Sequence, residues 1–436
     1  MRPFHTLFAI ALSALAACRQ TPSASDQKQS GVPHTRFSAD VQALCLEKTA
    51  GSDKLDRALD RARTVAQKGA DTGPAWVALG RLWMQKARVA QDPGFYRNVD
   101  ACADAALALE PNAAAAENLK GFVLLNDHEF RRARDLAEKI LSRDAGDRLA
   151  WGTLSDALLE LGDVDGAERA TQRMLDLKPD AASYGRAAHL RWLRGDREGA
   201  KRIFAQALKA SSQAADREPH AWLLVQTAQI FWHEGDVAGA DAGFRMALDR
   251  VPDYAPALVG RGRVAIAQKR FGDAVAHLER AYERSPSVES AWLLANARTL
   301  MGDQRGASVA SDRAVSAGRH DPATLAFFYA SRGQELDQAV RLARRAHDER
   351  PNTYSKDVLA WALYRAGKIA EASEISKQVV QWGTRDARLW FHAGAIRMAA
   401  GNAAAGRKLI ARALELNAHF DPFEAEEARR LARTNA

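Results

Sequence analysis

The 436-residue sequence has no apolar run long enough to cross a membrane. Its apolar stretch near the start, Leu7 to Ala17, is far shorter than the ~20 residues that a spanning helix requires. Hydrophobic residues form 47% of the chain and charged residues 27%, as in a folded soluble protein. The length would suggest about three ordinary domains, but one solenoid can use it because its core grows end to end.

The chain also lacks common motifs of catalysis and cofactor binding. It has no G-x-S-x-G elbow and no P-loop. His233-Glu234 opens like a zinc-protease motif, but Val237 stands where the second histidine belongs. Gly260 and Gly262 loosely resemble a dinucleotide-binding loop, but no strand precedes them. We therefore predict a protein that is not an enzyme and has no metal site or cofactor.

Basic residues outnumber acidic ones without gathering into a patch. The chain has 62 Lys and Arg against 54 Asp and Glu, a formal net charge of +8. The bases are dispersed and mixed with acids, whereas nucleic-acid binding is typical of a basic run or stripe. We predict no nucleic-acid partner. An acidic protein partner is compatible with the excess.

The N-terminus predicts the compartment. Arg2 gives a positive start, the apolar stretch follows, and residues 1–17 therefore indicate a signal sequence. The segment from Leu15 to Cys18 resembles the lipobox of bacterial lipoproteins. The resemblance implies a diacylglycerol on Cys18, cleavage before it and acylation of the new amino terminus, which anchors the chain to a leaflet. The alternative is an ordinary signal peptide cut after Ala17, with Cys18 free.

The residues after Cys18 predict a tether and a location. Residues 18–38 are rich in Ser, Thr, Gln and Pro, which is typical of a flexible linker. Arg19 stands where some inner-membrane lipoproteins carry Asp, so the same resemblance implies an outer-membrane lipoprotein facing the periplasm. Cys45 and Cys102 fall in predicted helices of different repeats, and an oxidising envelope permits a disulfide. The alternative is two buried thiols packing as small residues.

Self-similarity is the strongest signal in the chain. Glycines recur with a period of ~34 residues, each followed by Ala or Gly and an apolar helix. A second series of small residues keeps the same spacing with one longer step, after Ala200. The glycines are Gly162, Gly195, Gly235, Gly302, Gly333, Gly367 and Gly401, and the small residues are Ala133, Ala167, Ala200, Ala240, Ala274, Ala307, Ala339, Ala372 and Gly406.

Each unit resembles the tetratricopeptide repeat. Trp76, Leu79, Gly80 and Trp83 follow the pattern of its first helix, and the stretch from Ala240 to Pro252 follows that of its second. The resemblance implies an all-α solenoid of about eleven helix-turn-helix units over residues 39–420. Residues 421–436 predict a charged helix that caps the end of the stack.

The resemblance also implies a concave groove lined by the first helices, where a protein or peptide partner binds. Its arginines favour an acidic partner, and its large aromatic residues are typical binding anchors. For Trp222 and Trp232 the alternative is a core position between units. The predicted groove residues are Arg81, Arg186, Trp222, Trp232, Arg263, Arg365, Arg388 and Phe391.

Two specific functions fit these features, beside the alternative of an envelope spacer or chaperone of low specificity. The first is an envelope-anchored scaffold or assembly factor, similar in plan to repeat lipoproteins that assist secretin assembly, polysaccharide export or the cell-wall machinery. The second is a carbohydrate-binding or polysaccharide-processing protein that uses an aromatic groove. The lipobox and the repeats motivate the first, and the tryptophans motivate the second.

Overall fold

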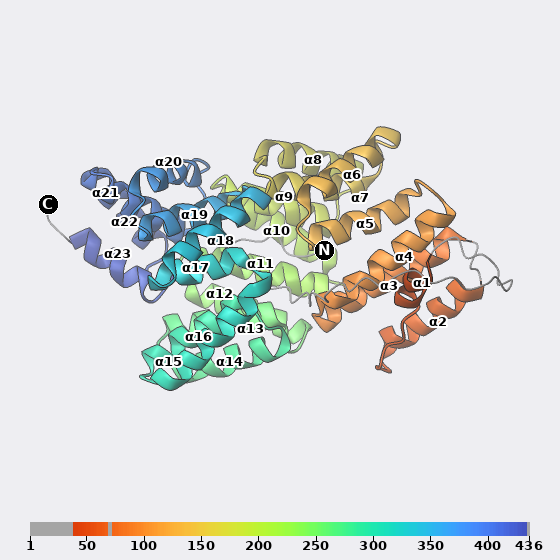
Figure 1. The fold of residues 1–436 in the computed structure, drawn as a ribbon, viewed down its shortest axis with the longest axis horizontal. Helices are drawn as coiled ribbons and strands as arrows, with labels where there is room; N and C mark the ends of the chain where they lie inside the picture. Colours follow the sequence, from red (N-terminus) through yellow and green to blue (C-terminus); the bar gives the residue numbers. More distant parts are fainter. Residues whose placement is uncertain (1–37, 69–71, 434–436) are drawn as a thin grey trace, which may run out of the picture.

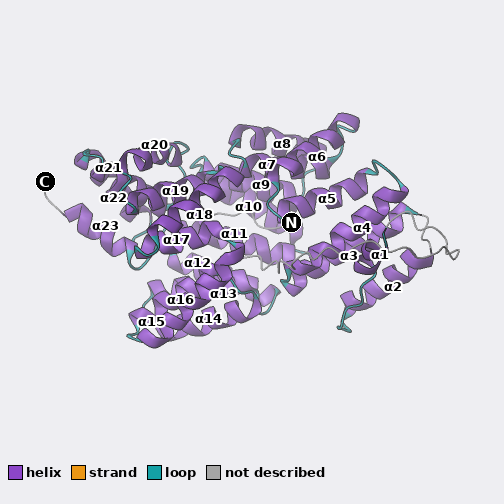
Figure 2. Ribbon diagram, viewed as in Figure 1, coloured by secondary structure: helices purple, strands orange, loops and turns teal. Residues whose placement is uncertain are grey.

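The computed structural model describes residues 38–68 and 72–433, and in these residues it is entirely helical (Figures 1 and 2). Twenty-three α-helices and two short 3-10 helices follow one another with no strand among them. This agrees with the all-α solenoid predicted from the sequence. The predicted signal sequence, Cys18 and the tether up to residue 37 lie outside the described residues.

Ten antiparallel helix pairs form the body of the described chain. The first helices of the pairs are α3 (Gly73–Ala90), α5 (Ala114–Asn126), α7 (Arg148–Glu160), α9 (Ala181–Leu193), α11 (Glu218–His233), α13 (Ala255–Ala267), α15 (Val288–Leu300), α17 (Pro322–Arg332), α19 (Thr353–Arg365) and α21 (Ala387–Ala399). The second helices are α4 (Tyr96–Leu109), α6 (Phe130–Arg143), α8 (Val164–Leu177), α10 (Arg197–Ser211), α12 (Val237–Arg250), α14 (Phe271–Arg284), α16 (Gln304–Ala317), α18 (Leu336–Glu349), α20 (Ile369–Val379) and α22 (Ala403–Leu416).

Shorter elements flank and join these pairs. Before the first pair come α1 (Ala39–Cys45) and α2 (Lys54–Lys68), and α23 (Glu424–Arg433) follows the last pair. The 3-10 helices η1 (Pro93–Phe95) and η2 (Gly318–His320) join neighbouring helices.

A Gly-Asp pair sets the turn inside several units. Gly162 has a φ of 82°, which ends α7, because glycine adopts this left-handed conformation without the steric cost of a Cβ. The carboxylate of Asp163 then accepts a hydrogen bond of 2.8 Å from the Gly166 amide and caps α8. Such a cap contributes about 1 kcal/mol to helix stability. The same cap is formed by Asp196, Asp236 and Asp303.

Small residues allow helices to pack closely, both within a pair and between neighbouring pairs. A Cβ added to Gly262 on α13 would lie 2.5 Å from the side chain of Leu278 on α14, and one on Gly260 would lie 2.4 Å from the ring of Phe244 on α12. These two glycines therefore serve helix packing, as the absence of a preceding strand predicted. The alanine at the repeated small position is fully buried in most units, as in Ala274.

The N-terminal helices have their own apolar cluster, which includes a disulfide. The structure joins Cys45 of α1 to Cys102 of α4, with Cα atoms 4.9 Å apart. The indole of Trp83 donates a hydrogen bond of 2.9 Å to the carbonyl of Cys45. Of the two alternatives left open by the sequence, the structure has the disulfide, and it attaches the short helix α1 to the first complete pair.

The solenoid coils tightly enough for one superhelical turn to touch the next (Figure 1). The turn between α7 and α8 meets the loop between α18 and α19, where a Cβ on Gly162 would lie 2.5 Å from the carbonyl oxygen of Pro351. The turn after α9 meets the loop after α20 in the same way, with Gly195 against Gly383. The turn after α11 meets the loop after α22, with Gly235 against Leu416. We call these three approaches the inter-turn contacts.

Hydrogen bonds accompany the inter-turn contacts. The hydroxyl of Thr384 donates to the Leu193 carbonyl at 2.7 Å, and the amide of Asn417 donates to the Trp232 carbonyl at 2.7 Å. The Asn352 amide donates to the buried carboxylate of Glu160 at 2.7 Å. Three successive units of one turn are thus bonded to three successive loops of the next, which fixes the pitch of the superhelix.

Candidate functional site

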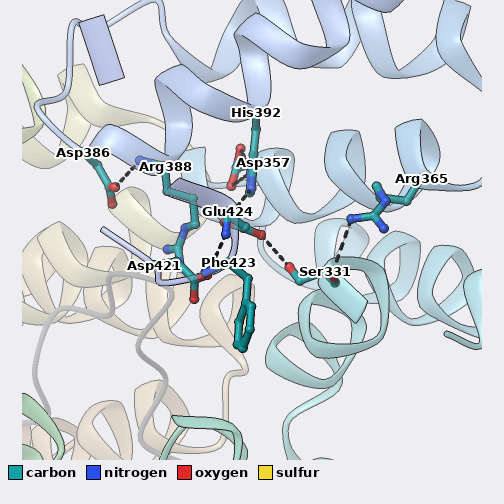
Figure 3. A network of polar contacts seen from close by, with 9 residues as sticks. All are labelled: Ser331, Asp357, Arg365, Asp386, Arg388, His392, Asp421, Phe423 and Glu424. Atoms are coloured by element: carbon teal, nitrogen blue, oxygen red, sulfur yellow. Dashed lines mark hydrogen bonds and ion pairs between the residues drawn. The ribbon is translucent and has the colours of Figure 1, made fainter. Parts of the chain in front are cut away.

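A buried cluster of charged side chains lies where α17, α19, α21 and α23 meet (Figure 3). The imidazole of His392 is at its centre. Its Nδ1 lies 3.0 and 2.9 Å from the two carboxylate oxygens of Asp357, and its Nε2 lies 3.4 Å from Glu424 Oε2. The Ser331 hydroxyl donates a hydrogen bond of 2.8 Å to the other Glu424 oxygen. We call these four residues and Arg388 the C-terminal polar network.

The network holds a proton on His392. Burial by itself would lower the pKa of this imidazole, but the carboxylates of Asp357 and Glu424 raise it to about 9. Burial would raise the pKa of Glu424, but His392 and Arg388 lower it below its ordinary value. At neutral pH an imidazolium therefore lies between two carboxylates, and the positive Arg388 stands beside them.

This arrangement suits helix docking better than catalysis. Serine, histidine and acid are the residue types of a hydrolase triad, but here the Ser331 hydroxyl bonds to Glu424 and not to the imidazole. His392 is 0% exposed and stacks on the ring of Trp361 at 3.9 Å between centroids. A proton held so firmly on a wholly buried ring is poorly placed to act as a general base at neutral pH. Its contacts instead join four helices.

The segment before α23 positions the first turn of that helix in this cluster. Asp421 Oδ1 accepts hydrogen bonds from the amides of Phe423 at 2.8 Å and Glu424 at 2.9 Å, which caps the start of α23. This cap aims the Glu424 side chain inward, towards His392 and Ser331 (Figure 3). The sequence predicted a charged capping helix here, but it did not predict that the first carboxylate of that helix would be buried.

Three of the predicted groove arginines are buried in ion pairs or against rings. Arg186 on α9 donates two hydrogen bonds, of 2.7 and 2.6 Å, to the carboxylate of Asp156 on α7. Arg263 on α13 pairs with Glu289 on α15. The Arg388 guanidinium lies 4.6 Å from the ring centroid of Phe327. The prediction of open groove arginines is therefore wrong for these three, because neighbouring units already hold them.

The predicted aromatic anchors are also core residues. Trp222 is 4% exposed and its ring lies 3.4 Å from the Cβ position of Gly185 on the preceding unit. Trp232 is 2% exposed, and the Arg263 guanidinium stands 5.8 Å from its ring. Phe391 is fully buried and packs on Trp361. Their prediction as groove anchors is corrected, and the alternative of a core position between units holds for both tryptophans.

The two remaining groove predictions lie nearer the surface. Arg81 on α3 is exposed. Arg365 on α19 is half-buried, donates a hydrogen bond of 3.3 Å to the Ser331 carbonyl and stands 5.5 Å from the ring of Trp361. The structure thus brings Trp232, Arg263 and Arg388 into one interior region and leaves Arg81 apart from it.

The same interior region holds further buried charge that the sequence did not single out. His233 Nδ1 lies 3.6 Å from Asp386 Oδ2. The pKa of Asp386 is held well below its ordinary value despite burial, because His233 and Arg388 are close. Burial raises the pKa of Glu289 to about 7, against the attraction of Arg263 and Arg388. These pairs connect the two superhelical turns through side chains as well as backbone.

Two hollows open on other faces of the described chain. One of about 400 Å³ lies among α8, α9 and α10 and is lined by Leu175, Leu190 and Ile203 with Arg169 and Arg191 at its edge. The other, of about 310 Å³, lies over α14 to α16. In the part of the chain that the structure describes, no group of three or more His, Cys, Asp and Glu side chains is placed to hold a metal ion. None of the described helices has both the length and the apolar character needed to cross a bilayer.

The helical pairs define a class, the α-solenoid of repeated helix hairpins. Sequence profiles identify the repeat: the tetratricopeptide repeat matches residues 124–189 and residues 225–289. The chain therefore contains tetratricopeptide repeats, which build surfaces for protein-protein interaction. A search of curated proteins finds no matching sequence.

Solved structures of similar shape share little sequence with this chain. PilW, described as a widely conserved type IV pilus biogenesis factor, is 16% identical, with 49% of this chain and 97% of PilW covered and a TM-score of 0.40. Human IFIT1, solved with m7Gppp-AAAA, is 14% identical over 88% of this chain and 96% of its own, with a TM-score of 0.49. A tetratricopeptide repeat protein of Parabacteroides merdae is 15% identical over 58% of this chain and 99% of its own, with a TM-score of 0.32.

Proposed function

We propose that this chain is a lipid-anchored scaffold of the bacterial cell envelope that binds protein partners through its repeats. The observation that carries the proposal is a solenoid of ten helix pairs whose buried polar groups join helices. Such a molecule offers surface for assembly, and we assign it no catalytic role. Secretin assembly, polysaccharide export and recruitment of cell-wall enzymes are the processes that such a scaffold would serve.

Two features support the envelope. The structure has a disulfide between Cys45 and Cys102, and such bonds persist in oxidising compartments such as the periplasm. The Leu15–Cys18 segment fits a lipobox. Several acyl chains on Cys18 would make anchoring stable, where a single chain would be marginal. Arg19 favours the outer membrane.

Lipidation is tested by changing the cysteine. In cells fed with labelled palmitate, the natural chain is expected to become labelled and to sediment with membranes. Cys18→Ser is expected to carry no label, because serine cannot form the thioether, and to leave the membrane fraction. Cys45→Ser is the matched control that keeps the label. Equal labelling of the natural and Cys18→Ser chains, or a natural chain found in the cytosol, would refute the anchor.

Partner binding is tested by crosslinking in intact cells. A photoreactive residue at Arg81, which is exposed on a first helix, is expected to capture a protein in near-stoichiometric yield. The same residue at Lys209, exposed on the second helix α10, is the matched control and is expected to capture little. Capture of no protein from Arg81, or the same mixture from both positions, would count against a specific scaffold.

The carbohydrate alternative loses its motivation in the structure. It depended on Trp222 and Trp232 lining an open groove, and both rings are buried between units. Buried rings cannot stack on a sugar without opening the solenoid. We therefore propose protein partners alone, and the arginine excess of the chain favours acidic ones.

A further inference from the structure

Helix α23 is attached to the solenoid mainly by polar groups. Its buried residues are Glu424, Ala425 and Ala428, so the only fully buried apolar side chains that it contributes are two methyl groups. Leu431 and Ala432 add partly buried contacts. Burial of a methyl group contributes only about 0.8 kcal/mol, so apolar contact holds this helix weakly.

The polar attachment is made by two carboxylates at the start of the helix. Glu424 lies against His392 and accepts the Ser331 hydroxyl. Asp421 is attracted to Arg332 and Arg388, although burial and the nearby Glu424 raise its pKa to about 6. A buried ion pair contributes little net stability because desolvation offsets most of its attraction. It discriminates strongly between binding partners, because a partner without the matching charge leaves the buried ion unpaired. We call Ser331, Arg332, Arg388 and His392 the α23 receptor face.

The receptor face is cationic once α23 is removed from it. Arg332, Arg388 and His392 would then face Asp357 and Asp386, while Glu289, the other carboxylate near Arg388, is already paired with Arg263. Among the described helices α23 packs mainly on α21 and α22, so its local unfolding is expected to cost less than that of a helix packed between two others. A helix that offers two acids three positions apart at its N-terminus would meet the same partners that Asp421 and Glu424 meet now.

We propose that a helix from a protein partner can displace α23, and that the α23 receptor face then binds the acidic N-terminal turn of that helix. This inference rests on the proposed scaffold function and specifies the chemistry of one partner. Charge complementarity supports this inference, because two carboxylates spaced as in Asp421 and Glu424 pair with the cations of the receptor face. Acidic residues are also stabilised at a helix N-terminus by the positive end of the helix dipole. The site for this one partner is therefore at the end of the solenoid where α23 docks.

The test uses the full chain and a peptide. Ala428→Arg places a charge at a wholly buried position of α23 and is expected to undock the helix without touching the receptor face. A fluorescent peptide of residues 417–433 is expected to bind the Ala428→Arg chain roughly tenfold more tightly than the natural chain, where α23 still occupies the face. The control is Glu426→Arg, which adds an arginine at an exposed position of the same helix and is expected to bind as the natural chain does.

A second peptide tests the chemistry. Asp421→Asn with Glu424→Gln in the peptide is expected to weaken binding to the Ala428→Arg chain by roughly tenfold, because each charged hydrogen bond is replaced by a weaker neutral one. Hydrogen exchange reports whether α23 has undocked. Equal binding of both peptides, or an Ala428→Arg chain that keeps α23 protected, or one that exposes α23 and binds no peptide, would overturn the inference.

The oligomeric state in solution distinguishes a second copy of this chain from a different protein as the occupant of the receptor face. If Ala428→Arg and the natural chain are both monomers, the face is available to a partner helix, as proposed. A dimer that exchanges α23 would overturn the partner in favour of a second copy of this chain. Failure of the Arg81 crosslinking with success of the peptide assay would refute the scaffold while leaving the receptor face, so the two proposals fail separately.

Discussion

Gly162→Ala is expected to lower the free energy of unfolding by about 2 kcal/mol more than Gly302→Ala. Both glycines have a φ of 82°, and both precede an aspartate that caps the next helix. The cost of forcing an alanine into the left-handed region, roughly 1 kcal/mol or more, is therefore common to both variants. What differs is the space around the new Cβ.

At Gly162 the new methyl group has no room. It would lie 2.5 Å from the carbonyl oxygen of Pro351, which belongs to the backbone and cannot rotate away, whereas Gly302 has nothing within 4 Å. The inter-turn contact at α7 and α8 must then open, which also strains the Asn352–Glu160 hydrogen bond. Overpacking of this kind costs roughly 1–3 kcal/mol.

Urea unfolding followed by circular dichroism measures the difference. Hydrogen exchange is expected to show faster opening of α7, α8, α18 and α19 in Gly162→Ala, while Gly302→Ala disturbs only its own turn. Equal loss of stability in the two variants would show that the turns of the superhelix do not depend on this contact.

The inter-turn contacts bear on function because they set the shape that the repeats present. The groove predicted from the sequence requires an open coil with an accessible inner face. Here backbone contacts at three successive units hold the coil at a fixed pitch, and the inner helices are buried along most of their length, as α19 and α21 show. Partners are then expected near the two ends of the described solenoid, where Arg81 and α23 lie.

The fold could be predicted because its signals are local. The glycine and alanine series report turns and close helix pairs within each unit, and the structure places Gly162 and Ala274 in those roles. The disulfide could be offered only as an alternative, because spacing in sequence says nothing about the distance between Cys45 and Cys102 in space. Local pattern therefore gave the class of fold and the order of its helices.

The candidate site could not be predicted, because its residues meet across units. Asp357 and His392 are 35 positions apart and Ser331 and Glu424 are 93 apart, and no spacing rule connects them. The prediction of an open groove was wrong for its buried residues for a related reason. Their positions on the first helices were right for an open coil, but the tight superhelix pairs Arg186 and Arg263 with carboxylates of the neighbouring units. A charged residue within an apolar stretch, such as His392 in α21, was the only available hint.

His392→Gln is expected to lower the stability of the chain by about 3 kcal/mol at pH 6.5 and by much less at pH 9.5. Glutamine leaves Asp357 and Glu424 buried without the cation between them. The pH dependence follows from the raised pKa, near 9 in the folded chain against 6.5 for an ordinary histidine. As pH rises between these values the unfolded chain loses its proton first, so it binds fewer protons than the native chain and stability falls.

The contribution of His392 is therefore complete below pH 6.5 and gone above pH 9. Urea unfolding at pH 6.5, 8 and 9.5 is expected to show the natural chain losing roughly 3 kcal/mol across this window, with the loss largely absent in His392→Gln. The exposed His419, changed to glutamine, is the matched control and is expected to leave the natural profile intact. Parallel profiles for the natural and His392→Gln chains would show that the imidazolium does not hold α23 to the solenoid, and this outcome would also weaken the case for a cationic receptor face at that end.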